Sequence, residues 1–365
     1  MTRPVRACIS ASALAHNVAV ARARMPGAKL MAAVKANAYG HGLAVCAPEL
    51  ARAGVEGFAV ASMEEAEQLY DLALGPPACL LAGPFAPEEI PLAAARGHIL
   101  VVHRAAQLAW LQTQRWDRPL SIWIKVDSGM HRLGFAPRAL GPVFEALSAV
   151  HSPLRILGLM SHLARSDTPD DPHNVRQIRE FRAVIGQWGE RTLGEHSLAN
   201  SGAILALGEA RFPWMRPGLM LYGLSPFPGQ TGRDLGLRPA LSWQAQIIAT
   251  RRLAPGEWLG YGAAYQAPHE QRVGVVACGY GDGFDRHLGQ GAPVWIGSQR
   301  SQTLGRVSMD LLFVDLQDSD AQEGDWVILM GVGAEPLESL AERLGTIPYE
   351  LGTRIQARVP RVLVP

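Results

Sequence analysis

Short apolar runs alternate with longer amphipathic stretches between about residue 28 and residue 225. The apolar runs occupy residues 29–34, 57–61, 78–82, 98–102, 121–126, 154–160, 195–199 and 215–221. Helix-like segments lie between them, among them residues 63–74, 87–95, 104–116, 138–150 and 174–188. Strands that alternate with helices predict parallel βαβ units, and about eight units in about 200 residues predict a (β/α)8 TIM-like barrel of the α/β class. An open, doubly wound sheet is the rival arrangement, but no GxGxxG follows the first strand.

The pattern changes after about residue 230. Residues 226–238 are rich in Gly, Pro and Arg and are typical of a connector. Beyond it, β-like runs at 241–249, 273–278, 293–296, 311–316 and 326–330 are separated by turns, and only residues 337–344 have a helical pattern. We therefore expect the barrel to span residues 8–230 and a smaller, mostly-β C-terminal domain to span residues 231–365. Residues 1–7 are expected to join the second domain.

Composition narrows the function classes. The chain has 365 residues, is 48% hydrophobic and carries a formal net charge of +1, with its arginines spread among acids. This balance argues against a nucleic-acid surface, which needs clustered cations. We find no secretory signal and no apolar run long enough to span a membrane. The four cysteines are widely separated, so we expect no disulfide framework and no metal site, and a cytoplasmic protein.

A lysine follows the first strand of the predicted barrel. Barrel enzymes build their active sites at the carboxyl ends of the strands, and Lys35 comes directly after the apolar run at 29–34. Apolar surroundings lower the pKa of a lysine and favour the neutral amine, which is the form that attacks a carbonyl group. Position alone does not decide the matter, because a lysine at a strand end is more often an ordinary partly buried side chain.

A series of motifs changes that balance. In chain order they are AVKANAYGHG (33–42), KVDSGMHRLG (125–134), MSHL (160–163), NSG (200–202), RPG (216–218), GYG (260–262), GYGDG (279–283), GRVSMD (305–310) and RVPR (358–361). The first motif resembles the lysine signature of the alanine racemase family, whose members use pyridoxal 5′-phosphate (PLP). The resemblance continues in order along nearly the whole chain. It implies a barrel followed by a β domain, and an enzyme that interconverts L-alanine and D-alanine.

The resemblance implies two bases, Lys35 and Tyr261. Lys35 would carry PLP covalently and work on one face of the planar carbanion, while Tyr261 would work on the other. Two fixed bases avoid the reorganisation that a single base would need. A tyrosine acts as a base near neutral pH only when a polar group stabilises its anion, and His162 matches the histidine that does this in the family.

The remaining site residues are also implied by the resemblance. Arg216 would face the pyridine nitrogen of PLP, and because arginine has only donors it disfavours a protonated ring. The cofactor phosphate would be held by the hydroxyls of Tyr39, Ser201 and Tyr349 and by backbone N–H groups near Ser201, Gly218 and Leu219. His162 and Asn200 would also be among the cofactor-binding residues. Taken alone, Asn200 and Ser201 are equally well explained as a helix cap. Arg132 and the backbone N–H of Met309 would bind the substrate carboxylate.

Further resemblances concern Lys125 and the route into the site. Lys125 matches a lysine that is carbamylated in many family members, which would make it an anion able to pair with Arg132; an ordinary Lys–Asp pairing is the alternative. Asp167, Tyr280 and Arg286 match residues near the family's substrate channel. In the family, the tyrosine base and the methionine come from the neighbouring subunit, which implies a homodimer with composite sites.

Several alternatives stay open at this stage. A racemase of serine or of broad specificity would differ only in pocket size, and a methylene group changes binding by only about 1–3 kcal/mol. A barrel-type PLP decarboxylase is disfavoured by Arg216, and a non-catalytic PLP-binding protein is disfavoured by the second domain with Tyr261 and Met309. The sequence does not distinguish a role in D-alanine supply for peptidoglycan from a role in alanine breakdown.

Overall fold

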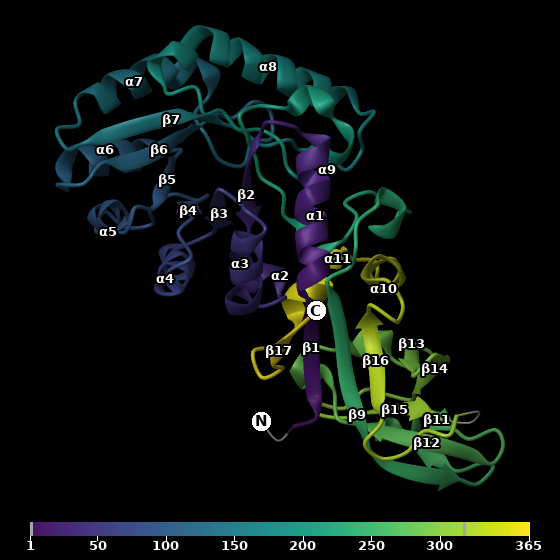
Figure 1. Cartoon of the computed structure of the whole chain (residues 1–365). Helices are drawn as coiled ribbons and strands as arrows, with labels where there is room; N and C mark the ends of the chain where they lie inside the picture. Colours follow the sequence, from purple (N-terminus) through teal and green to yellow (C-terminus); the bar gives the residue numbers. More distant parts are fainter. Residues whose placement is uncertain (1–2, 317–318) are drawn as a thin grey trace.

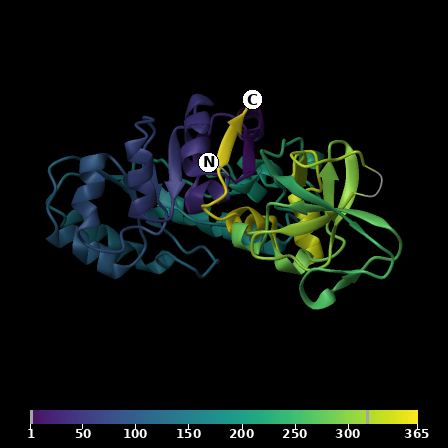
Figure 2. The same cartoon turned by 90° about the horizontal axis from the view of Figure 1, so that it is seen from below.

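The computed structural model describes residues 3–316 and 319–365. It has a curled parallel sheet with helices around it and a second part built from antiparallel strands, and the two lie side by side in Figures 1 and 2. This arrangement confirms the predicted fold class. None of the described helices is long and apolar enough to cross a membrane.

Within the described residues, seven parallel strands form the curled sheet in the order β7-β6-β5-β4-β3-β2-β8. They are β2 (Lys29–Ala33), β3 (Gly57–Val60), β4 (Ala78–Leu80), β5 (Ile99–Val102), β6 (Leu120–Lys125), β7 (Leu154–Met160) and β8 (Trp214–Met215). The single residue Ser197 bridges Met160 of β7 on one side and Trp214 of β8 on the other, both in parallel. The eighth predicted position therefore exists, although it is one bridging residue rather than a strand.

The helices of this part lie before its first strand and between successive strands. They are α1 (Ala11–Arg24), α2 (Lys35–Tyr39), α3 (Leu43–Arg52), α4 (Met63–Asp71), α5 (Glu89–Arg96), α6 (Ala105–Thr113), α7 (Leu140–Ser148), α8 (Pro172–Trp188) and α9 (Ser201–Ala206). Local signals set their starts: Pro172 occupies the first position of α8, and the Asp171 carboxylate caps it by accepting from His173 N–H. The predicted helix ends differ from these by a few residues.

Side-chain alternation along the strands produces two apolar layers. One layer joins the buried residues Met31, Ala33, Ala59, Cys79, Ile99, Val101, Trp123, Met160 and Trp214. The residues between them in sequence, such as Ala32 and Phe58, belong to the larger core that includes the helices. The rings of Trp123 and Trp214 meet edge to face at 5.6 Å, so the inside of the curled sheet is filled by side chains.

The second part is an eight-stranded sheet in the order β12-β15-β14-β13-β16-β9-β1-β17, again counting only the described chain. Its strands are β1 (Val5–Ser10), β9 (Leu241–Leu253), β12 (Gln271–Val276), β13 (Pro293–Ile296), β14 (Gln299–Leu304), β15 (Leu312–Asp315), β16 (Trp326–Gly331) and β17 (Arg361–Val364). The short strands β10 (Trp258–Leu259) and β11 (Tyr265–Gln266) pair with each other. Strand β1 pairs with β9 and β17, so the start of the chain lies in this sheet; residues 1 and 2 fall outside the described residues.

Three sequence-based predictions need correction. The expected strand at 215–221 ends at Met215, and Leu219–Tyr222 forms a 3-10 turn, because Pro217 has no N–H to donate and Gly218 leaves the extended conformation. The expected strand at 195–199 contributes only the bridges of Ser197. Helix α10 (Leu337–Leu344) is as predicted, but a further helix, α11 (Pro348–Arg354), follows it with proline at its first position.

Candidate active site

A cavity of about 960 Å³ opens at the carboxyl ends of the parallel strands. Lys35 follows β2, Lys125 ends β6, and His162 lies two residues beyond β7. The predicted site residues that line this cavity are Lys35, Tyr39, Lys125, Arg132, His162, Asp167, Asn200, Ser201, Arg216, Gly218, Leu219 and Tyr349. Residues that are far apart in sequence therefore meet where a parallel sheet gathers its strand ends.

Lys35 has surroundings that favour its neutral form. Burial lowers the pKa of Lys35 below its ordinary value, the Arg132 guanidinium lowers it further, and the Glu65 carboxylate opposes both effects. An amine that loses its proton more easily is a better nucleophile towards a carbonyl carbon.

Arg216 is fixed by three oxygen acceptors. Its guanidinium donates to Ser197 Oγ, to the Ser161 carbonyl at 2.6 Å and to the Leu198 carbonyl at 3.3 Å. Burial lowers the pKa of Arg216 to about 10, so it stays charged near neutral pH. A buried cation with a fixed direction can donate to a ligand atom but cannot take a proton from it.

His162 is a neutral histidine against this guanidinium. Its Nδ1 lies 3.4 Å from Arg216 Nη2, and its Nε2 lies 3.5 Å from Asn200 Nδ2. Burial, followed by the positive charges of Lys125 and Arg216, holds the pKa of His162 well below its usual value. Since an arginine only donates, Nδ1 is the acceptor in this contact.

A set of hydroxyl and N–H groups gathers on one wall of the cavity. Ser201 Oγ accepts from the N–H groups of Gly218 at 3.0 Å and Met220 at 3.3 Å. The rings of Tyr39 and Tyr349 lie 5.9 Å apart. Burial and then Asp167 raise the pKa of Tyr349 to about 12, and burial raises the pKa of Tyr39, so both hydroxyls keep their protons and can donate.

This wall suits a phosphate group, and a close approach at Gly218 is part of it. A Cβ atom at Gly218 would lie 2.4 Å from Tyr39 Oη, so only glycine lets the backbone at this position come so near the hydroxyl. Together with the Lys35 amine and the Arg216 guanidinium, these donors match the aldehyde, pyridine nitrogen and phosphate of PLP. The residues present therefore fit the cofactor that the sequence resemblance implies.

Lys125 is a buried lysine that lies among positively charged side chains. Burial, followed by Arg216 and Arg132, lowers the pKa of Lys125 well below its ordinary value. Its amine makes no hydrogen bond or ion pair with any residue in the described part of the chain. The alternative of an ordinary Lys–Asp pairing is therefore not formed among the described residues, and the lowered pKa means that this amine loses its proton more easily than an exposed lysine does.

Four expected site residues do not line the cavity: Tyr261, Tyr280, Arg286 and Met309. Tyr261 is 72% exposed and Met309 is 54% exposed, which is unusual for side chains of this kind. All four belong to the second part of the chain. The expectation that Tyr261 and Met309 serve the cavity of a neighbouring subunit stays a prediction.

Sequence reasoning missed residues that hydrogen-bond to the backbone near Lys35. Glu65, in the first turn of α4, accepts from two backbone N–H groups beside the cavity. The buried Tyr222 hydroxyl donates to the Ala33 carbonyl at 2.9 Å, just before Lys35. An acid in the first turn of a helix is a recognised signal, but its usual meaning is helix stabilisation rather than support for another loop.

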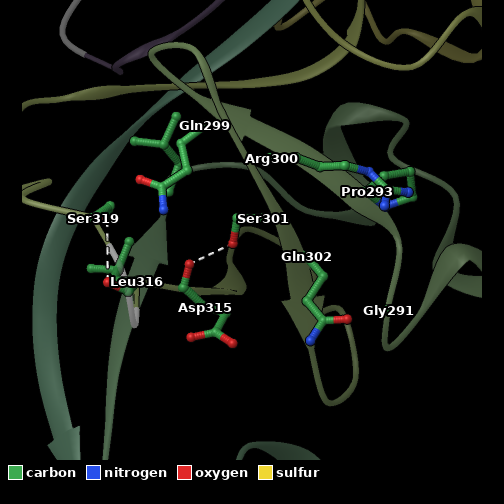
Figure 3. Close-up of a pocket in the computed structure, with 10 residues that line it drawn as sticks. Gly291, Pro293, Gln299, Arg300, Ser301, Gln302, Asp315, Leu316 and Ser319 are labelled. Carbon is green, nitrogen blue, oxygen red and sulfur yellow. Dashed lines mark hydrogen bonds between the residues drawn. The ribbon is translucent and has the colours of Figure 1, made fainter.

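A second cavity of about 380 Å³ lies in the β part. Figure 3 shows it along β13, β14 and β15, with side chains such as Gln299, Gln302 and Asp315. It contains none of the expected site residues.

Comparison with known proteins agrees with this geometry. Residues 9–226 match the family described as alanine racemase, N-terminal domain, and residues 240–363 match alanine racemase, C-terminal domain. The expected boundary between residues 230 and 231 falls between these matches and stays a prediction. The curated alanine racemase of Acidithiobacillus ferrooxidans is 60% identical over 364 residues, with 100% of each chain covered.

Solved structures give the same answer. The biosynthetic alanine racemase of Pseudomonas aeruginosa superposes with a TM-score of 0.88 at 41% identity, covering 100% of each chain. The alanine racemase of the D-cycloserine producer Streptomyces lavendulae has a TM-score of 0.91 at 31% identity, covering 100% of this chain and 98% of that one. The chain belongs to the alanine racemase family.

Proposed function

We propose that this chain interconverts L-alanine and D-alanine with PLP held in the large cavity. The observation that carries the proposal is that one cavity joins a lysine of lowered pKa, a fixed arginine that can donate but not accept, and a donor set suited to phosphate. The names of the curated relatives support alanine as the substrate. A serine or broad-specificity racemase, a decarboxylase and a non-catalytic PLP-binding protein have no observation in their favour.

The cofactor would be held by residues on three sides of the cavity. Its covalent anchor would be the Lys35 amine, and its phosphate would accept from Tyr39, Ser201, Tyr349 and the N–H groups of Gly218 and Leu219. When bound, PLP supplies a conjugated ring that withdraws electrons from the amino acid and weakens the bond between Cα and its hydrogen. Arg216 would donate to the ring nitrogen without protonating it, which keeps this withdrawal moderate and disfavours side reactions. Asn200 and His162 would contribute hydrogen bonds around the bound cofactor.

Two bases on opposite faces would exchange the proton at Cα. Lys35 would hold it on one face and Tyr261 of a second copy on the other. The exposed Tyr261 and Met309 side chains support a homodimer in which each β part completes the partner's cavity. Arg132 would bind the substrate carboxylate through its two-pronged guanidinium, and the Met309 N–H would donate to the same group.

Lys125 is proposed to react with carbon dioxide through its neutral amine. The Lys125 nitrogen would form a bond to the carbon of carbon dioxide and release a proton to solvent, and the resulting carbamate would place an anion beside the positive charges of Arg132 and Arg216. Asp167 lines the cavity and is proposed, with Tyr280 and Arg286, to border the substrate's path in the dimer.

We also propose that the enzyme works in the cytoplasm and supplies D-alanine for peptidoglycan. All four cysteines are buried and unpaired, which fits a reducing compartment. The relative from Pseudomonas aeruginosa is described as biosynthetic, and it matches this chain over its full length.

The proposal is tested by reducing the purified holoenzyme with borohydride and mapping the modified peptide. We expect a visible absorbance band that disappears on reduction and a cofactor adduct on Lys35. In parallel, optical rotation of L-alanine should decay to zero. A protein that takes up no PLP, or one that carries the adduct on a lysine other than Lys35, would refute the assignment of the site.

A further inference from the structure

The residues directly after Lys35 form a left-handed turn. Ala36, Asn37, Ala38 and Tyr39 all have positive φ angles between 52° and 55°. In this conformation Cβ crowds the next carbonyl oxygen, so residues other than glycine rarely adopt it, and consecutive ones less still. Such a segment persists only where its surroundings hold it, and it is characteristic of functional sites.

Most backbone groups of this turn are held locally. Ala38 N–H donates to the Val34 carbonyl at 2.7 Å, and Gly40 N–H donates to the Ala36 carbonyl at 2.9 Å. The Asn37 side chain accepts from Leu43 N–H at 2.7 Å. The first N–H of the turn, that of Ala36, is different because its acceptor comes from another element.

That acceptor is Glu65 of α4. Glu65 Oε1 accepts from Ala36 N–H at 2.7 Å, and Glu65 Oε2 accepts from Ala61 N–H at 2.7 Å. Ala36 follows β2 and Ala61 follows β3, and these neighbouring strands pair in parallel up to Ala33 and Ala59. One carboxylate therefore ties together the carboxyl ends of two strands at the edge of the cavity, where both Ala36 and Ala61 line the wall.

We propose that Glu65 is a positioning residue for Lys35: its carboxylate holds the first N–H of the left-handed turn and so fixes the direction in which the Lys35 side chain enters the cavity. This inference rests on the proposed function of Lys35. Glu65 does not line the cavity and acts through Ala36. An ionised acceptor is needed because charge-assisted hydrogen bonds are the stronger kind, and the strained turn has to be held against its preferred conformation. Its negative charge also opposes the loss of the Lys35 proton that burial favours.

The test replaces Glu65 by glutamine. Glu65→Gln keeps the size but loses the charge, and its amide can accept only one of the two bonds. We expect kcat to fall about tenfold to a hundredfold, because small displacements of a reacting group have effects of this size. KM for alanine should stay within about twofold, since the groups that would bind the carboxylate are untouched. The matched control is Glu64→Gln, the exposed neighbouring acid on the same helix, which should behave as wild type.

A second measurement needs neither catalysis nor cofactor. In the PLP-free protein, hydrogen–deuterium exchange of the peptide spanning residues 33–42 should be faster in Glu65→Gln than in wild type or Glu64→Gln, with other peptides unchanged. Unaltered exchange in this peptide, or a kcat within about twofold of wild type, would overturn the inference. If Glu65→Gln does not fold, Glu65→Asp keeps the charge but is too short to reach both N–H groups, and the same two criteria apply. Adduct mapping on wild type tests the role of Lys35 separately. Failure of the proposed function is therefore distinguished from failure of the positioning role of Glu65.

Discussion

Replacing Gly218 by alanine tests whether the wall at Tyr39 binds the cofactor phosphate. The new Cβ would lie 2.4 Å from Tyr39 Oη and 2.9 Å from Tyr39 Cζ, whereas ordinary contacts begin at 3.4 Å. The Tyr39 hydroxyl would therefore have to move by about 1 Å. The Tyr39 ring cannot turn freely, because it packs against two other rings. Its centroid lies 5.1 Å from the centroid of the Tyr222 ring and 5.9 Å from that of the Tyr349 ring.

This displacement would disturb two groups that are proposed to donate to the phosphate, the Gly218 N–H and the Tyr39 hydroxyl. A hydrogen bond to a charged group contributes about 1.5–3 kcal/mol. Weakening one of them should raise the dissociation constant of PLP about tenfold to a hundredfold, which corresponds to about 1.4–2.8 kcal/mol. The assay is a titration of the PLP-free variant with PLP, followed by absorbance. Activity at saturating PLP should recover only in part.

The matched control is Gly208→Ala. Gly208 has a φ outside the left-handed region, and a Cβ added there would meet no atom within 4 Å, so this substitution should leave PLP affinity unchanged. If Gly218→Ala bound PLP within about twofold of Gly208→Ala, the phosphate would not depend on this wall. The assignment of Tyr39 and Gly218 as cofactor ligands would then be wrong.

Two further substitutions probe the β part. Tyr261→Phe should keep PLP affinity but lose activity at least a hundredfold by racemisation assay, since it would remove the proposed second base; unchanged turnover would contradict the two-base assignment. Asp282→Asn should lower the free energy of unfolding by about 3 kcal/mol in urea melts, because it breaks a buried ion pair with Arg3 and Arg358. Burial raises the pKa of Asp282, but hydrogen bonds from Arg3 and Arg358 outweigh this and lower it overall. A lowered folded-state pKa stabilises the protein above the unfolded pKa, so the difference between wild type and variant should shrink as the pH falls below about 4; a gap that is constant down to about pH 2 would refute this.

The barrel strands were predictable because side chains on both faces of the strands are buried. Residues 57–60 and 99–102 are buried throughout, so their apolar runs are short and uninterrupted. The same signal misleads at 215–221, where the apolar run continues past Pro217 and Gly218 although the strand ends at Met215. The apolar residues after Gly218 are buried in a 3-10 turn. Their composition does not distinguish such a turn from a buried strand.

Most of the cavity residues were predictable as members of motifs, and the supporting groups were not. Lys35 follows the apolar run at 29–34 and Arg216 lies at the start of the run at 215–221, and strand ends of a parallel sheet converge, so their meeting follows from the fold. Glu65 reaches Ala36 across a separation of 29 residues through hydrogen bonds to the backbone. Nothing in the side-chain chemistry of Ala36 reports such a bond, because any residue except proline has the same N–H.

Tyr261 and Met309 are exposed, yet the loop that carries Met309 is not loose. The Met309 carbonyl accepts from Gly281 N–H at 2.8 Å, and the Ser308 carbonyl accepts from Tyr280 N–H at 3.0 Å, so two loops are joined. Beneath them the fully buried Asp282 binds the guanidinium groups of Arg3 and Arg358, which come from the two ends of the chain. An exposed apolar side chain on a braced loop loses little conformational entropy when a partner covers it. The bracing therefore supports the proposal that the Met309 loop is shaped in advance for a second subunit.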